Sequence, residues 1–133
     1  HIDEGNNKGK SNWFFDNATQ QNVKYDIIGL SFYPFWINKE YTAVIKDLEE
    51  NLIELSAKYN KEVMIVEVGG EDFKIEETQK LLTATLNAVK NVPNNKGVGV
   101  HYWEPQGAKS WSGYGLSAWR PDGKPSPALD AFK

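Results

Sequence analysis

Three apolar runs recur at an almost constant interval along this chain, and this interval constrains the fold more than any other feature. The runs begin at about Asp26, Glu62 and Gly97, so they are 36 and 35 residues apart. Segments with apolar residues at helical spacing lie between them. The alternation predicts βαβαβ units with parallel strands, because such crossovers are right-handed. The interval matches one unit of a (β/α)8 barrel, roughly 250 residues over eight units, although a doubly wound sheet has the same rhythm.

The two segments between the runs are the most distinct predicted helices, Tyr41–Tyr59 and about Glu76–Asn91. Their apolar stripes consist of Tyr41, Val44, Ile45, Leu48, Leu52, Leu55 and Tyr59 in the first helix, and of Leu81, Leu82, Thr85, Ala88 and Val89 in the second. We expect both stripes to pack against the sheet while the polar faces meet solvent. Shorter helices are predicted at Asn12–Gln21 and Ala128–Phe132, and a long loop from Gln106 to Pro127.

One further strand is expected upstream, because counting back one interval from Asp26 reaches the start of the chain. His1-Ile2-Asp3 is then the end of that strand. Residues 1–133 therefore form one predicted domain, with three whole strands and the end of a fourth. This amounts to about half of a barrel. A chain that begins with His1 rather than Met is expected to be a piece of something longer.

Composition excludes several classes of function. The net charge of −3 and pI of about 5.4 come without a basic cluster, which argues against a nucleic-acid or anionic-membrane partner. The chain has no Cys and only two His, so no thiolate metal site can form and a zinc site is not expected. No apolar stretch approaches the roughly 18 residues that cross a bilayer. We therefore expect no metal, no cofactor and no membrane span.

Acidic, hydroxyl-bearing and aromatic residues lie at the predicted strand ends. These residues are Asp3, Ser31, Tyr33, Glu67, Trp103 and Glu104. The C-terminal ends of parallel strands meet on one face, where α/β barrels place their active sites. Enzymes that cleave sugars use a carboxylate that attacks or stabilises the anomeric carbon, together with an aromatic surface on which the sugar ring packs. Trp111 lies in the predicted loop from Gln106 to Pro127, and we expect its aromatic ring to belong to the same ligand-binding surface.

Glu67 directly follows the apolar run Val63–Val66, and a charge in that position needs a physical reason. Burying a charge is costly unless it is paired or hydrogen-bonded. One interpretation is a catalytic carboxylate at the end of a parallel strand. The other is a structural carboxylate that pairs with a lysine or a helix N-terminus, and the residues alone leave both open.

Four segments form an ordered set of motifs: His1-Ile2-Asp3, Asp26–Pro34 (DIIGLSFYP), Ile65-Val66-Glu67 and Gly99–Pro105 (GVHYWEP). In order and spacing they resemble the fifth to eighth strand motifs of family 53 glycoside hydrolases, the arabinogalactan endo-β-1,4-galactanases. The resemblance extends over nearly the whole chain. It implies α/β architecture, with this chain as the C-terminal half of a (β/α)8 TIM barrel and carrying strands five to eight.

The resemblance also implies roles for particular residues. In this family the nucleophile of retaining hydrolysis ends the seventh strand and the acid/base ends the fourth. Glu67 matches the nucleophile, and Asp3, Ser31, Tyr33, Trp103, Glu104 and Trp111 are the implied substrate-binding residues. The acid/base would lie upstream of His1, so the fragment alone is expected to be inactive. The fragment is expected to associate with the missing N-terminal half or with a second copy. The complete enzyme is expected to act on β-1,4-galactan in a secreted, periplasmic or cell-surface location.

Two loops depart from the family pattern. Many members have Thr-Gly or Thr-Ala after the nucleophile and a longer loop before the next helix, whereas here Val68-Gly69-Gly70 leads quickly to Glu76. Gln106-Gly107-Ala108 stands where an aromatic residue is common. Both loops border the cleft, so the resemblance leaves the exact polysaccharide and any loop-bound calcium open. Two other functions also stay open: a non-catalytic carbohydrate-binding protein on the same scaffold, and an unrelated α/β domain for a small ligand.

Overall fold

The computed structural model describes residues 1–133 and contains one parallel three-stranded sheet in the order β1-β2-β3. Its strands are β1 (Ile27–Phe32), β2 (Glu62–Val68) and β3 (Gly97–Tyr102). The helices that connect them are α2 (Ile45–Tyr59) and α3 (Ile75–Lys90). Successive strands therefore begin 35 residues apart, and the predicted βαβαβ order is confirmed.

The first residues of the chain lie beside β1 as the end of a neighbouring strand would. Ile2 forms a parallel bridge with Leu30. Its N–H donates to the Gly29 carbonyl at 3.1 Å, and its carbonyl accepts from the Ser31 N–H at 3.0 Å. The predicted fourth strand end is thus present as a single bridge.

The helix α1 (Lys8–Gln20) begins four residues before the predicted start at Asn12. The side chain of Asn7 caps it by accepting a hydrogen bond from the Lys10 N–H at 3.1 Å. Asparagine is among the best N-caps, because its side-chain oxygen satisfies an N–H that otherwise has no partner in the first turn. The prediction rested on the apolar spacing that begins after Asn12, and it did not use the N-cap residue Asn7 in the polar loop before it.

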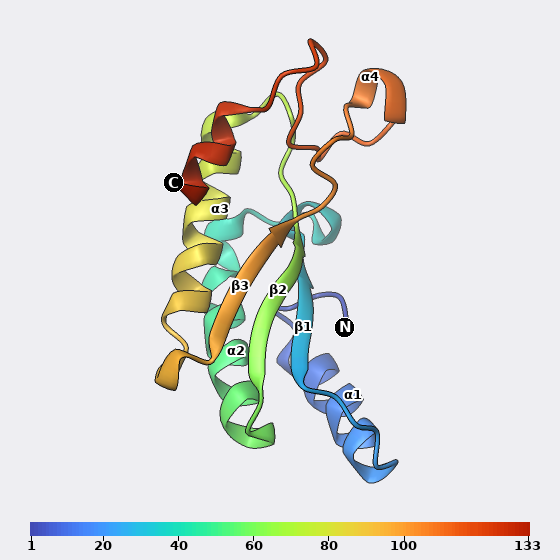
Figure 1. Ribbon diagram of the computed structural model, residues 1–133, viewed down its shortest axis with the longest axis vertical. Coiled ribbons are helices and arrows are strands. Elements are labelled where there is room, and N and C mark those ends of the chain that lie inside the picture. The colour runs from blue at the N-terminus through green and yellow to red at the C-terminus, as the bar shows by residue number, and fades with distance from the viewer.

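The helices α2 and α3 cover one face of the sheet, as Figure 1 shows. Leu48, Leu52 and Leu55 of α2 are fully buried, and so is Leu82 of α3. They pack in one apolar core with residues from alternate positions of β1 and β2, namely Ile28, Leu30, Phe32, Val63 and Ile65. Most of the predicted stripe residues are therefore confirmed as core, whereas Tyr41, Ile45 and Tyr59 are only partly buried against it. The first predicted helix starts later than expected, because Tyr41–Ala43 forms a separate 3-10 helix and α2 begins at Ile45.

No helix of the chain covers the other face of the sheet (Figure 1). Here Val66 lies against Gly29, and Met64 lies near Gly99. Both side chains are only partly buried. In a closed (β/α)8 barrel the corresponding face is the packed interior. The open face of this sheet thus corresponds to the inside of a barrel.

The segment after β3 returns over the C-terminal ends of the strands. The predicted loop from Gln106 to Pro127 contains the short helix α4 (Lys109–Ser112) and a bridge between Trp119 and Pro125. The chain ends in the 3-10 helix η4 (Pro127–Phe132), which packs beside α3 (Figure 1). The remaining 3-10 helices are η1 (Pro34–Ile37), η2 (Tyr41–Ala43) and η3 (Pro93–Asn95). None of the helices is both long enough and apolar enough to span a bilayer.

Candidate active site

An extra residue in β2 decides where the Glu67 side chain points. On one side Leu30 pairs with Ile65 and Ser31 with Glu67; on the other, Val100 pairs with Ile65 and Tyr102 with Val68. The strand therefore carries a bulge, which shifts the alternation of side chains by one residue. Without it Glu67 would face the helices, as Val63 and Ile65 do. With it, buried Val68 takes the core position and Glu67 turns to the open face.

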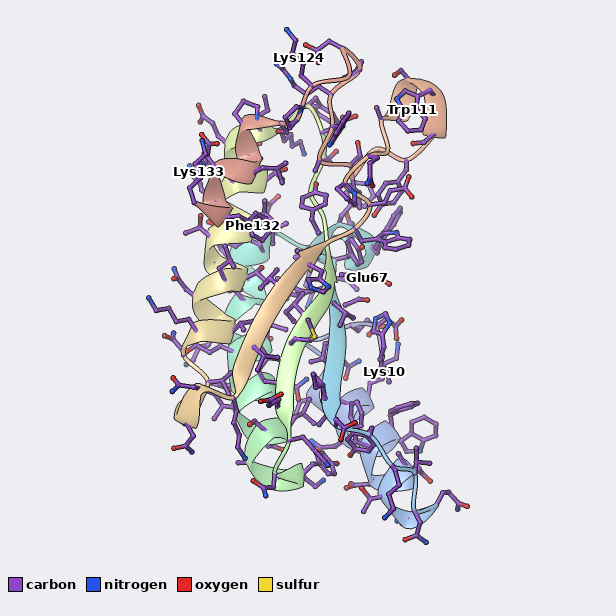
Figure 2. All side chains as sticks on the ribbon, viewed as in Figure 1. Lys10, Glu67, Trp111, Lys124, Phe132 and Lys133 are labelled. Carbon is purple, nitrogen blue, oxygen red and sulfur yellow. The ribbon has the colours of Figure 1, made fainter.

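Glu67 lies near the C-terminal end of β2 with its side chain 29% exposed (Figure 2). The Tyr33 hydroxyl donates a hydrogen bond to its Oε2 at 3.4 Å. Its Oε1 lies 4.0 Å from Nε2 of His1. That same imidazole nitrogen lies 2.6 Å from Oγ of the buried Ser31. The carboxylate has no lysine or arginine partner, which weakens the interpretation of Glu67 as one half of a structural ion pair.

Tyr33 sits between Glu67 and the loop that follows β3. Burial raises the pKa of its phenol, and contact with the Tyr114 hydroxyl and the negative charge of Glu67 raise it further. Burial likewise raises the pKa of Tyr114. Both phenols therefore remain protonated at neutral pH and can serve as hydrogen-bond donors.

Trp103 follows β3 directly and is 50% exposed, so part of its indole is available to a ligand. Its backbone N–H donates to the Val68 carbonyl at 2.9 Å, which extends the pairing of β2 with β3 by one residue. Its own carbonyl accepts from the Tyr114 hydroxyl at 3.3 Å. Tyr114 thus connects Trp103 to the Tyr33–Glu67 pair. The next peptide bond, Trp103–Glu104, is cis, and the Glu104 side chain lies against Gly107.

Gly69 holds these strand ends close together. A Cβ at this position would lie 2.7 Å from the Leu116 carbonyl oxygen, 2.9 Å from that of Trp103 and 3.3 Å from the Tyr33 ring. No side chain fits there without displacing backbone atoms. The glycine after Val68 is therefore required by the approach of three segments rather than by an unusual backbone angle.

Tyr102 anchors the same junction from the end of β3. Its hydroxyl donates to the Leu116 carbonyl at 2.9 Å and also lies 3.3 Å from the Gly70 N–H, from which it accepts. Burial raises the pKa of Tyr102 to about 12, against the opposing effect of the Gly70 hydrogen bond. The phenol remains neutral and ties the loop after β2 and the segment that contains Leu116 to the end of β3.

Two residues expected at the site lie outside this arrangement. Asp3 is exposed and forms an ion pair with Lys10 Nζ at 2.7 Å. Trp111, 66% exposed on α4, stands apart from Glu67 in Figure 2. Conversely, His1 and Tyr114 contact the site although they were not expected there. The period of two in a strand relates His1 to Asp3 and is a signal that could have identified His1. Tyr114 lies in a loop that carries no periodic signal.

The assembled geometry is a carboxylate with aromatic neighbours at the open end of a parallel sheet. Nowhere in the 133 residues do three or more His, Cys, Asp or Glu side chains gather in a way that could hold a metal ion. The parallel βα units, covered by helices on one face and with functional groups at the strand ends, define the chain as half of a (β/α)8 barrel.

The sequence profile of glycosyl hydrolase family 53 matches residues 1–132, and the chain belongs to that family. An uncharacterised protein of Niallia circulans is 30% identical over 128 residues, which cover 79% of this chain and 34% of that protein. An arabinogalactan endo-β-1,4-galactanase of Thermothelomyces thermophilus is 29% identical over 126 residues, covering 79% and 36% of the two chains. The chain thus spans about a third of the length of these relatives.

Solved structures support the same architecture. A chain from the structures of two fungal β-1,4-galactanases superposes with a TM-score of 0.80 and 26% identity, over 98% of this chain and 45% of that one. The family 53 catalytic domain of Ignisphaera aggregans superposes with a TM-score of 0.78 and 18% identity, over 97% of this chain and 44% of that one. The predicted half barrel is therefore confirmed.

Proposed function

We propose that this chain is the part of a retaining endo-β-1,4-galactanase that carries the nucleophile. The observation that carries the proposal is the position of Glu67: a carboxylate without a lysine or arginine partner, turned by the β2 bulge to the open face and hydrogen-bonded to Tyr33. Membership of family 53 and the galactanase names of its relatives supply the reaction and the substrate class.

In the proposed reaction Glu67 attacks the anomeric carbon and forms a glycosyl ester, while the bond to the leaving-group oxygen breaks. A second carboxyl protonates that oxygen and then activates the water that hydrolyses the ester. In retaining enzymes the two groups are about 5–5.5 Å apart. The proposal places the second group on a part of the barrel outside this chain.

The remaining residues have supporting roles in this proposal. Tyr33 orients the attacking oxygen of Glu67, and the half-exposed indole of Trp103 provides an apolar surface for a sugar ring. Ser31 positions the imidazole of His1 beside the carboxylate. Glu104 and the Asp3–Lys10 pair supply polar groups at the cleft margin, and Trp111 supplies an aromatic face on the outer loop.

The proposed setting follows from the substrate. β-1,4-Galactan is a polymer, so we propose that the enzyme acts outside the cytoplasm, in a secreted, periplasmic or cell-surface location. The proposed binding partners are the galactan or arabinogalactan chain and the other half of the barrel, or else a second copy of this chain.

The test uses the barrel that contains this chain with Glu67→Gln. A neutral amide cannot form the glycosyl ester, so release of reducing ends from β-1,4-galactan should fall by at least about a thousandfold, while galactan binding persists. Glu62→Gln, at the exposed start of the same strand, is the matched control and should retain activity. Azide added to Glu67→Ala should partly restore turnover with inverted product. Full activity of Glu67→Gln would remove the assignment.

A non-catalytic galactan-binding protein on the same scaffold is a second candidate, because the half-exposed indole of Trp103 offers an aromatic face to a sugar ring whether or not cleavage follows. The same measurement separates the two functions. Binding of galactan without any release of reducing ends by the unmutated barrel would favour the binding protein.

A further inference from the structure

A cavity of about 480 Å³ lies beside the candidate active site, between the loop after β1 and the loop after β2. Its volume is within the roughly 300–1,000 Å³ of small-molecule sites. Phe35, Asn38 and Tyr41 line it on one side, and Gly69, Glu77 and Thr78 on the other. All of its lining residues belong to two consecutive βα units, so these units alone form the cavity.

The cavity adjoins the site through Gly69. That residue lines the cavity, and it also packs against the ring of Tyr33, whose hydroxyl contacts Glu67. The cavity itself reaches Thr78 and Leu81 of α3, which belong to the helix layer. It therefore lies to the side of the open face on which Glu67 stands. A polymer bound along the open face could reach it only with a lateral substituent.

The loop after β2 packs tightly on α3 at the edge of this cavity. Gly70 lies so close to Thr78 that any side chain at position 70 would collide with the threonine. Thr78 in turn donates a hydrogen bond to the Glu71 carbonyl at 3.1 Å, which holds the loop against the first turn of α3. These contacts fix the position of the loop at the edge of the cavity.

The lining suits an uncharged, hydroxyl-rich group. Its charged residues are Lys39 and Lys74 against Glu40, Glu71 and Glu77, so two positive charges face three negative ones. This balance disfavours a uronate, a phosphate or any other anion.

The uncharged part of the lining favours a sugar over an apolar ligand. Only three of the thirteen lining residues are hydrophobic. Asn38 and Tyr41 offer an amide and a phenol that make no side-chain hydrogen bond within the chain, and Phe35, 45% exposed, offers an aromatic face. Hydroxyl groups and apolar C–H faces of a sugar match these groups.

We propose that the cavity receives a neutral pentose branch of the polysaccharide, an arabinosyl substituent on the galactan main chain. This proposal rests on the proposed galactanase function and adds a specificity determinant to it. The side chains of Asn38, Tyr41 and Phe35 contact the branch while Glu67 acts on the main chain. Substituted galactan is then a better substrate than it is for a variant in which the cavity is filled.

The test fills the cavity with Glu77→Trp, at an exposed position of α3 where a large side chain is tolerated. The matched control is Glu76→Trp: the neighbouring residue points about 100° away around the helix and does not line the cavity. In the barrel that contains this chain, Glu77→Trp should lower kcat/KM for arabinose-substituted galactan about tenfold and leave that for unbranched β-1,4-galactan unchanged. Glu76→Trp should change neither.

A binding measurement on the 133-residue chain separates this inference from the galactanase function. L-Arabinose should shift the backbone amide signals of Asn38 and Thr78 in NMR spectra, and Glu77→Trp should abolish the shifts while Glu76→Trp keeps them. If the barrel cleaves neither polymer, the galactanase function fails and the arabinose shifts alone decide the cavity. Equal effects of Glu77→Trp on both polymers, or no arabinose shifts in the unmutated chain, would overturn the pentose site.

Discussion

The residue with the strongest influence on Glu67 is Tyr33. Its hydroxyl is the one side-chain group that donates a hydrogen bond to the Glu67 carboxylate within the chain. Because burial, Tyr114 and Glu67 all raise the pKa of this phenol, it keeps its proton at neutral and mildly alkaline pH. Tyr33 is thus a fixed donor, and it sets the direction in which the carboxylate presents its free oxygen.

Tyr33→Phe should therefore reduce catalysis without unfolding the protein. Loss of one hydrogen bond to a charged group is expected to lower kcat/KM on galactan by about tenfold, or about 1.4 kcal/mol, chiefly through kcat. Tyr25→Phe is the control, because its phenol makes no hydrogen bond while its ring packs against Phe15. Steady-state kinetics of the barrel that contains this chain provide the measurement. Unchanged kcat in Tyr33→Phe would mean that Glu67 needs no such donor.

Tyr102 is expected to make stability depend on alkaline pH. The phenol has an ordinary pKa near 10 in the unfolded chain, and burial raises it to about 12 in the folded one. Its stabilising contribution is therefore complete below pH 10 and declines as the pH rises from 10 to 12, because only the unfolded state readily loses the proton. Urea titrations of the chain and of Tyr102→Phe should show a smaller decline in the variant. Equal slopes would contradict this assignment.

Among the elements, α2 joins the sheet to the N-terminal segment. Its stripe packs on β1 and β2, and Gly5 leaves room for Leu48 because a Cβ there would lie 2.9 Å from Leu48 Cδ1. On the same helix Asn51 is fully buried and donates to the Gly5 carbonyl at 2.7 Å and to Ser11 Oγ at 3.0 Å. Asn51 thus ties the start of α1 to α2 from inside the core, where Ser56 of the same helix is also buried.

Leu48→Ala or Leu52→Ala should lower the free energy of unfolding by about 2–5 kcal/mol, since each removes a fully buried side chain and leaves a cavity. Lys46→Ala, with its side chain 85% exposed on the same helix, should change it by less than about 0.5 kcal/mol. Urea titration followed by circular dichroism compares the three variants. A small loss in both leucine variants would show that the stripe is not core.

At the scale of the whole molecule, the sheet has one face without helices and an edge without a partner. β3 pairs only with β2, and beyond β1 the sheet continues only as the bridge at Ile2. Exposed strand edges are templates for pairing with another chain. The open face corresponds to the interior of a barrel. Both features suit a partner that completes the barrel.

The 133-residue chain by itself should therefore not hydrolyse galactan, because the proposed mechanism needs a second carboxyl about 5–5.5 Å from Glu67. Mixing it with a separately produced segment that corresponds to the first four units of the barrel should restore activity in a reducing-sugar assay. A mixture with Glu67→Gln should stay inactive. Turnover by the lone chain that disappears in Glu67→Gln would show that the chain already holds both catalytic groups.

The sequence by itself determined the three strands, the two helices between them and the order of these elements. Strand and helix periodicity are local properties, so Leu48 and Leu82 could be assigned to the core from their spacing, and Glu67 and Trp103 to strand ends from the runs that precede them. The helix start at Lys8 was missed by four residues, because its signal was the capping side chain of Asn7 rather than apolar spacing.

Only the tertiary structure decided how the site is assembled. The bulge that turns Glu67 to the open face depends on pairing with β1 and β3, and no local pattern marks it. His1 and Tyr114 reach the site from 66 and 47 residues away in the chain, and Asp3 turns to Lys10 instead. Contacts between distant segments depend on register and on the space that glycines such as Gly69 leave, which periodicity does not encode.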